Sequence, residues 1–174
     1  MVIVISGEAT WNSEICTEEI VGSVRWVSET GVGRMSQAQA KRPRHGGCHC
    51  GAVRFAAILP DNVVALSCNC SICAKTGFIH VITPGADFRI MHGEDMLTEY
   101  RFNTGTARHY FCRQCGVEAF NVPRSHPDDW SVNLRCFDKD AGLLPRFQEF
   151  DGANWEANIG NINPERALDR ANDA

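Results

Sequence analysis

The sequence predicts a single mainly β domain, built of antiparallel sheets and clipped together by a four-cysteine metal site. Three observations support this prediction: short apolar runs of strand length, turn-forming residues between them, and cysteines in tight groups far apart in the chain. The chain has 174 residues, of which 44% are hydrophobic and 22% charged. It is therefore long enough for one sizeable hydrophobic core.

The first 40 residues differ in texture from the rest of the chain. They mix Gly, Ser, Glu and Gln with short apolar pieces. We expect residues 1–40 to form a poorly structured extension and residues 41–174 to form the metal-binding domain. The apolar run Val2–Ile5 is too short for a signal peptide, and no stretch approaches the roughly 20 apolar residues of a membrane span. The sequence thus predicts a cytoplasmic protein that does not interact with membranes.

From His45 onward, short runs rich in apolar and β-branched residues have the length and partial alternation of strands. Segments with Pro, Gly and Asn, such as Leu59–Asn62 and Thr83–Asp87, separate them as turns. Helix is expected only as a short piece near the C-terminus. The runs expected to be strands are, in order, residues 52–57, 63–66, 78–82, 88–90, 97–102, 109–111 and 130–134.

The formal net charge of -4 argues against a protein whose main partner is a nucleic acid. One local exception runs from Arg34 to Arg54, a stretch that contains five basic residues and no acidic one. Such a run could contact an anion, but a solvated, flexible arm is the favoured interpretation because short basic runs are common on protein surfaces. The basic residues are Arg34, Lys41, Arg42, Arg44 and Arg54.

Seven of the nine cysteines fall in three tight groups, and without a signal peptide these groups favour metal over disulfides. Residues 46–51 and 112–116 both resemble zinc knuckles, in which two thiolates face one metal and a following Gly takes the left-handed conformation of the turn. Two such half-sites complete a tetrahedral, closed, structural zinc site. Its predicted ligands are Cys48, Cys50, Cys112 and Cys115.

The middle group, Cys68, Cys70 and Cys73, supplies three thiolates within six residues. Structural zinc sites use four protein ligands, whereas catalytic sites keep three and leave the fourth position to water or substrate. We therefore expect a second, open zinc site here, which gives two zinc ions per chain and makes these three cysteines the candidate catalytic residues. An open position would let an incoming thiol bind as thiolate.

Other groupings of the cysteines are compatible with the sequence. Cys48 and Cys50 could join Cys68 and Cys70 in one closed site, which would leave Cys73, Cys112 and Cys115 as the open trio. The middle group could also be a redox dithiol, or a closed site completed by His80 or His109. The histidines are individually more typical of surface or packing positions, and His49 is expected to point away from the metal.

The cysteine motifs carry a resemblance to the glutathione-dependent formaldehyde-activating enzyme family. The segments that resemble the family are Gly47–Phe55, Cys68–Cys73 and Phe111–Val117, and the resemblance extends over about residues 45–156. Three further segments are most similar to the centromere protein V branch of that family. They are Tyr100–Thr104, Val122–Pro127 and Phe150–Glu156.

The resemblance implies a β-tent fold with one four-cysteine and one three-cysteine zinc site. It also implies the family reaction, in which glutathione and formaldehyde condense to S-hydroxymethylglutathione, formally carbon–sulfur lyase chemistry in reverse. All seven motif cysteines are present in this sequence. A chain nearer to the centromere protein V branch need not share that substrate.

Two functions are therefore compared. In the enzyme hypothesis, a thiol such as glutathione binds at the three-cysteine zinc and attacks a small aldehyde. The alternative is a non-catalytic zinc module that binds a protein or, through the basic stretch, a nucleic acid. Since glutathione carries two carboxylates, cationic neighbours are expected, and the candidates near the motifs are Lys75, Arg108, Arg113 and Arg124.

Overall fold

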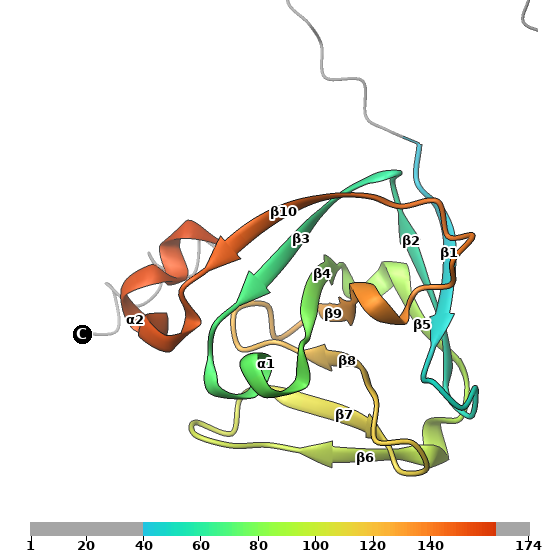
Figure 1. Ribbon diagram of the computed structural model, residues 1–174, viewed down its shortest axis with the longest axis horizontal. Helices are drawn as coiled ribbons and strands as arrows, with labels where there is room; N and C mark the ends of the chain where they lie inside the picture. The colour runs from blue at the N-terminus through green and yellow to red at the C-terminus, as the bar shows by residue number, and fades with distance from the viewer. Residues whose placement is uncertain (1–39, 163–174) are drawn as a thin grey trace, which may run out of the picture. The chain divides into compact units, whose positions relative to one another are not determined.

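The computed structural model describes residues 40–162. They form ten strands: β1 (Arg42–Gly47), β2 (Arg54–Leu59), β3 (Asn62–Cys68), β4 (Ile79–Thr83), β5 (Phe88–His92), β6 (Leu97–Tyr100), β7 (Arg108–Cys112), β8 (Glu118–Val122), β9 (Trp130–Asn133) and β10 (Leu144–Phe150). Two short α-helices, α1 (Ser71–Thr76) and α2 (Trp155–Asn158), accompany them (Figure 1). Five 3-10 turns complete the described elements: η1 (Gly85–Asp87), η2 (Glu94–Met96), η3 (Leu134–Cys136), η4 (Gly152–Asn154) and η5 (Ile159–Asn161).

The strands make two sheets. One has three strands in the order β1-β2-β5, and the other has seven in the order β10-β3-β4-β9-β8-β7-β6. Every pair of neighbouring strands is antiparallel except β10 and β3, which are parallel. Figure 1 shows β10 running beside β3 before the chain enters α2. The expectation of a mainly β domain is confirmed, with a sheet that is mixed at one edge.

Alternating side chains explain how the two sheets pack. In β2, Phe55, Ala57 and Leu59 are buried and their neighbours are less so, because successive side chains of a strand point to opposite faces. Phe55 packs edge-on against Phe120 of the larger sheet, with ring centroids 6.0 Å apart. The main core therefore lies between the sheets, and it includes Cys48 and Cys112.

The basic stretch is not a free arm where the structure describes it, which corrects the favoured interpretation. Residues 42–47 form β1, and the Arg44 side chain is only 1% exposed because it forms an ion pair with Asp61 and donates to the carbonyls of Ala141 and Gly142. Arg54 pairs with Asp138. These arginines fix loops of their own domain, and Arg34 lies outside the described residues.

Three other elements were not expected from the sequence: α1, β8 and β10. All five residues of β8 are buried, including the polar Glu118 and Asn121. Because these two polar residues interrupt the apolar pattern, the sequence did not indicate a strand here. The proposed extension falls almost wholly outside the described residues, and its boundary near residue 40 stays a prediction. Within the described part of the chain, no helix combines the length and apolar character needed to cross a bilayer.

Candidate metal centres and the adjoining pocket

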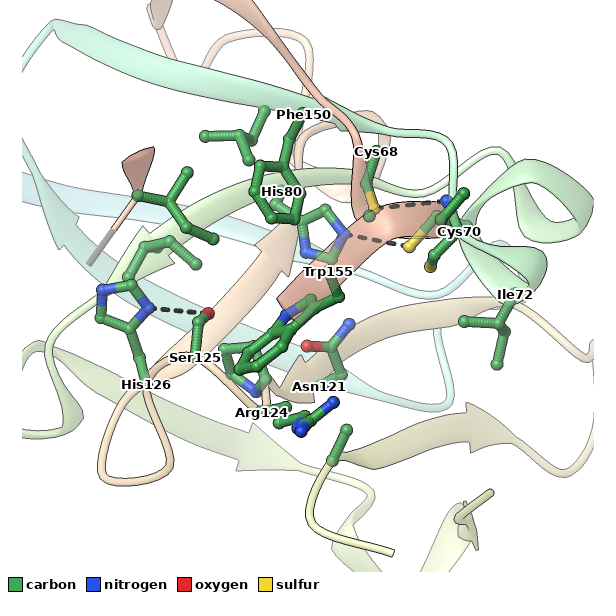
Figure 2. A pocket seen from close by; sticks show the side chains of 18 of the residues that line it. Cys68, Cys70, Ile72, His80, Asn121, Arg124, Ser125, His126, Phe150 and Trp155 are labelled. Carbon is green, nitrogen blue, oxygen red and sulfur yellow. Dashed lines mark hydrogen bonds between the residues drawn. The ribbon is translucent and has the colours of Figure 1, made fainter. Parts of the chain in front are cut away.

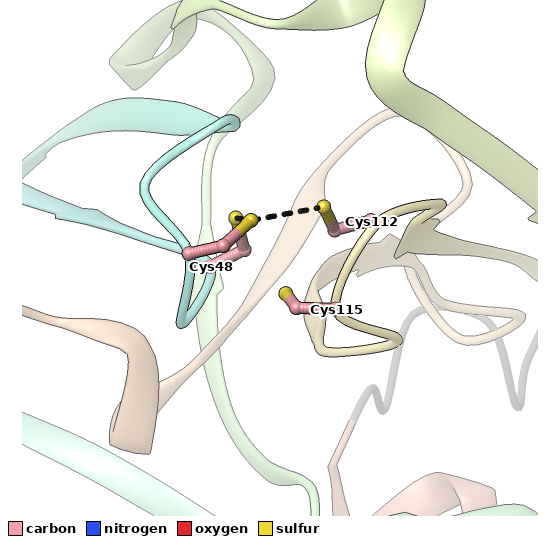
Figure 3. Close-up of side chains that lie close together, drawn as sticks. Cys48, Cys112 and Cys115 are labelled. Carbon is pink, nitrogen blue, oxygen red and sulfur yellow. Dashed lines mark hydrogen bonds between the residues drawn. The ribbon is translucent and has the colours of Figure 1, made fainter.

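Four cysteines from two hairpins that are distant in the sequence converge beside the core (Figure 3). Cys48 and Cys112 are buried, Cys115 is half-buried and Cys50 is exposed. Cys48 and Cys50 follow β1, whereas Cys112 ends β7 and Cys115 lies in the turn after it. The Cys50 sulfur lies 3.5 Å from that of Cys48 and 3.7 Å from that of Cys112. All four sulfurs lie within 4.8 Å of one another. The structure therefore groups Cys48 and Cys50 with Cys112 and Cys115, not with Cys68 and Cys70.

The two turns that carry these cysteines share one backbone design. Gly51 and Gly116 follow the second cysteine of each pair with φ angles of +78° and +74°, a conformation that glycine adopts without steric cost. The Gly51 amide donates to the Cys48 carbonyl, and the Gly116 amide donates to the Cys112 carbonyl. The Val53 amide donates to the Cys48 sulfur at 3.3 Å. The sequence encodes these turns locally, as a Cys-Gly pair directly after each hairpin strand.

The other three cysteines lie on the connection between β3 and β4. Cys68 ends β3, Cys70 precedes α1, and Cys73 lies within that helix, which ends at Gly77 in a left-handed cap. The helix folds the connection back so that all three sulfurs lie within 4.8 Å of one another. Hydrogen bonds from the Cys68 thiol, and then from Cys73, lower the pKa of Cys70 to about 2, because they stabilise its thiolate. Contacts with Cys68, and then with Cys70, raise the pKa of Cys73.

His80 contacts the three-cysteine group but is not part of the cluster whose ligand atoms all lie within 4.8 Å of one another. Its Nε2 lies 3.1 Å from the Cys73 sulfur, and its Nδ1 lies 2.7 Å from the Ser131 hydroxyl. Burial lowers the pKa of His80 to about 4, so the ring is neutral at pH 7. This contact suits a ring whose Nε2–H donates to the sulfur while Ser131 donates to Nδ1.

The segment after β10 braces the three-cysteine loop from the other side. The Asn69 side chain donates to Asp151 and accepts from the Ala153 amide, each at 2.8 Å. Gly152 lies so close to Cys68 that a Cβ on it would be 2.4 Å from the sulfur. This segment, 84 residues further along the chain than the loop, therefore helps to set the positions of the sulfurs.

The three cysteines open onto a cavity of about 680 Å³, shown from close by in Figure 2. Its walls combine apolar residues, such as Ile72 and Phe150, with polar ones from β7, β8 and the segment 123–126. None of the four cysteines of the other group lines it. The two groups therefore differ in what adjoins them: the four-cysteine group borders the core, with Cys48 and Cys112 buried and Cys50 exposed, whereas the three-cysteine group faces a space that could hold a ligand.

Of the four cations expected near the site, Arg124 lines the cavity and Lys75, Arg108 and Arg113 do not. The Arg124 guanidinium lies 3.8 Å from the ring centroid of Trp155 and donates to Glu156 at 2.5 Å. Cation–π contact and ion pairing together hold this charge at the rim.

Three buried polar residues beside the cavity were not selected from the sequence as a group. His109 and Asn121 line the cavity and both contact Glu118, the first residue of β8. No local motif signals this cluster, because it depends on the pairing of β7 with β8, in which His109 lies opposite Asn121. Its only sequence signal is the presence of polar residues inside two otherwise apolar strands.

Both cysteine groups fit a metal ion by the nature of their donors. Sulfur ligands gathered within 4.8 Å could hold one ion in each group, and thiolates favour soft or borderline metals over Mg²⁺ or Ca²⁺. Within residues 40–162, these two clusters are the groups that meet this test. The four-thiolate set suits a closed site, whereas the three-thiolate set leaves room for a further ligand.

The fold and the site define a class: a mainly β domain that carries two cysteine clusters, one of them beside a cavity. Comparison with known proteins gives the family. Residues 43–152 match the family described as glutathione-dependent formaldehyde-activating enzyme, and the chain belongs to it.

Two individual proteins extend the comparison. The chain is 35% identical over 78 residues to a Halomonas elongata protein named as a glutathione-dependent formaldehyde-activating enzyme. This match covers 40% of the chain and only half of that protein's length. A crystal structure of a Rhodobacter sphaeroides protein is similar with a TM-score of 0.51 and 36% identity, and the match covers 60% of this chain and 99% of that one.

Proposed function

We propose that this protein joins a thiol, glutathione or a similar one, to a small aldehyde such as formaldehyde, as a carbon–sulfur lyase working in the direction of synthesis. The observation that carries the proposal is the cavity onto which Cys68, Cys70 and Cys73 open. A non-catalytic module would need no such opening beside a cluster of three sulfurs. Membership of the family supports the same reaction.

We propose zinc as the metal of both groups, with two ions per chain. Cys48, Cys50, Cys112 and Cys115 would hold the structural ion, and Cys68, Cys70 and Cys73 the one beside the cavity. Bound there, zinc supplies a coordination position at which an incoming thiol is held as a nucleophilic thiolate. Free thiols suit a reducing compartment, which keeps a cytoplasmic location as our prediction.

The protein around the three cysteines supplies binding and orientation. A cavity of about 680 Å³ has the size of typical small-molecule sites. Apolar residues such as Ile72 and Phe150 offer contact surface for a bound substrate, and Arg124 is the cation among the lining residues that could meet a carboxylate of glutathione. Holding both reactants in one cavity removes much of the entropic cost of their encounter.

The assignment to the centromere protein V branch remains a prediction. Two of the segments that suggested it supply Arg124, Ser125, His126 and Trp155 to the cavity wall. Branch-specific residues at that place would act on the choice of thiol or aldehyde, while the cysteines would stay the same.

The test uses glutathione and ¹³C-formaldehyde, with the exchange between free and thiol-bound formaldehyde measured by NMR. We expect the wild-type protein to accelerate this exchange. We expect Cys70→Ser to abolish both the acceleration and the binding of glutathione, while its circular dichroism spectrum stays that of the wild type. Cys136→Ser is the matched control, because this cysteine lies outside both groups. Glutathione binding retained in Cys70→Ser would contradict the proposal.

A further inference from the structure

His109 is a buried histidine in which one ring nitrogen forms a hydrogen bond and the other has no partner among the described residues. The residue is 5% exposed, and its Nδ1 lies 2.7 Å from the Glu118 carboxylate. Because a carboxylate accepts hydrogen bonds, Nδ1 carries the hydrogen and donates it. Nε2 of the neutral ring is then a bare acceptor, and it has no hydrogen-bond partner within the described residues.

Asn121, directly opposite on β8, repeats the pattern. It is 1% exposed, and its Nδ2 donates to the same Glu118 oxygen at 3.4 Å, while its Oδ1 is without a partner in the described part of the chain. A buried polar atom without a hydrogen-bond partner destabilises the folded state. Two such acceptors on neighbouring residues therefore point to a donor that arrives with a ligand.

The residues that carry the unpartnered atoms belong to the wall of the cavity. His109 and Asn121 line the cavity that holds the three cysteines, whereas Glu118 does not, and Figure 2 shows Asn121 among the lining side chains. Because Glu118 takes up the opposite end of each side chain, His109 Nε2 and Asn121 Oδ1 are the buried atoms left for a ligand in this cavity. His80, which contacts Cys73, lines the same cavity as His109.

On the basis of the function proposed above, we propose that His109 is the acid–base residue of the reaction, that Glu118 positions its ring, and that Asn121 receives the hydroxyl of the product. Nε2 takes the proton that leaves the thiol. The sulfur then forms a bond to the carbonyl carbon, the C=O double bond becomes a single bond, and the proton passes from Nε2 to the oxygen. The product hydroxyl donates to Asn121 Oδ1, and no oxidant or reductant takes part.

The chemistry requires this transfer because thiol addition to an aldehyde moves one proton from sulfur to oxygen. A positioned acid–base group contributes about 10²–10⁴-fold to such steps. The Glu118 carboxylate fixes the Nδ1–H tautomer and stabilises the imidazolium that forms between the two proton transfers. The aspartate of a Ser-His-Asp triad does the same for its histidine.

The experiment measures the enzyme-dependent exchange of ¹³C-formaldehyde with glutathione on the full-length, zinc-loaded protein, in water and in deuterium oxide. The variants are His109→Gln and Glu118→Gln, and the second keeps a hydrogen-bonding side chain of the same shape. His92→Gln is the matched control, since His92 is exposed on β5 and outside the cavity. Calorimetry with glutathione and zinc analysis accompany each variant.

We expect His109→Gln to lower the exchange rate by about 10²-fold or more and to remove the solvent isotope effect, with glutathione affinity and zinc content unchanged. Glu118→Gln should lower the rate less, and His92→Gln should not change it. A wild-type rate in His109→Gln or in Glu118→Gln overturns the proposal, as does a loss of glutathione binding together with the rate. If His109→Gln does not fold, Glu118→Gln decides alone. No acceleration by the wild-type protein overturns the proposed function as well, so the two failures are distinguishable.

Discussion

Gly152 has no side chain at the point where the segment after β10 passes closest to the three-cysteine group. A Cβ there would lie 2.4 Å from the Cys68 sulfur and 3.2 Å from the Cys70 Cβ. Neither neighbour is the end of a long flexible side chain, so an added methyl group must displace the sulfur or the segment that carries it. The position of Cys68 thus depends on a glycine more than 80 residues away.

Gly152→Ala should therefore damage the open site selectively. We expect an overpacking cost of about 1–3 kcal/mol, loss of zinc from the three-cysteine group, and weaker glutathione binding. Zinc analysis and urea unfolding of the two proteins measure these effects. Retention of the full zinc content and of glutathione affinity would contradict the role given to this glycine.

Cysteine spacing predicted the members of each motif, because each motif is a local structure. The choice of partner for Cys48 and Cys50 stayed open in the sequence, and the fold decides it by bringing Cys112 and Cys115 to them. The partnership of His109, Glu118 and Asn121 could not be predicted in this way. It arises from strand pairing and from a register shift between Tyr110 and Phe111, neither of which leaves a mark in a single sequence.

The four-cysteine group ties together elements of the two sheets. One of its turns joins β1 to β2 in the three-stranded sheet, and the other joins β7 to β8 in the seven-stranded sheet. A metal held between them would cross-link the sheets through the main core, in which Cys48 and Cys112 are buried. The three-cysteine group, by contrast, lies within one connection of the larger sheet.

Cys112→Ser and Cys70→Ser should consequently differ in their effect on stability. Metal binding supplies on the order of 10 kcal/mol in small zinc-dependent domains, so we expect Cys112→Ser to lower the thermal midpoint strongly or to prevent folding. Cys70→Ser should lower it far less. Differential scanning calorimetry compares the two variants, and equal midpoints would contradict the separate roles of the two groups.

Strands with alternating or apolar side chains, such as β2 and β3, were predictable from the sequence. β1 and β10 were not, because each contains a proline, and β1 also ends in two glycines, which argue against a strand by propensity. Both lie at sheet edges, where a proline removes no hydrogen bond that the sheet requires. Arg44 was also placed wrongly by its residue type. A charged side chain is expected in solvent, but the ion pair with Asp61 allows this one to be buried.

Within residues 40–162, the two sheets, the core and the two cysteine groups form one arrangement. The four-cysteine group borders the core between the sheets through the buried Cys48 and Cys112, and the three-cysteine group meets the cavity. The central claim is that the domain holds one closed metal site and one open site, and that the open one carries the chemistry.

Zinc stoichiometry tests that claim most directly. Native mass spectrometry of protein purified under reducing conditions, without added metal, counts the ions on each chain for the wild type and for Cys70→Ser. We predict two zinc ions on the wild type and one on a folded Cys70→Ser variant. A wild-type chain with a single ion, unchanged by Cys70→Ser, would contradict the open site and the reaction assigned to it.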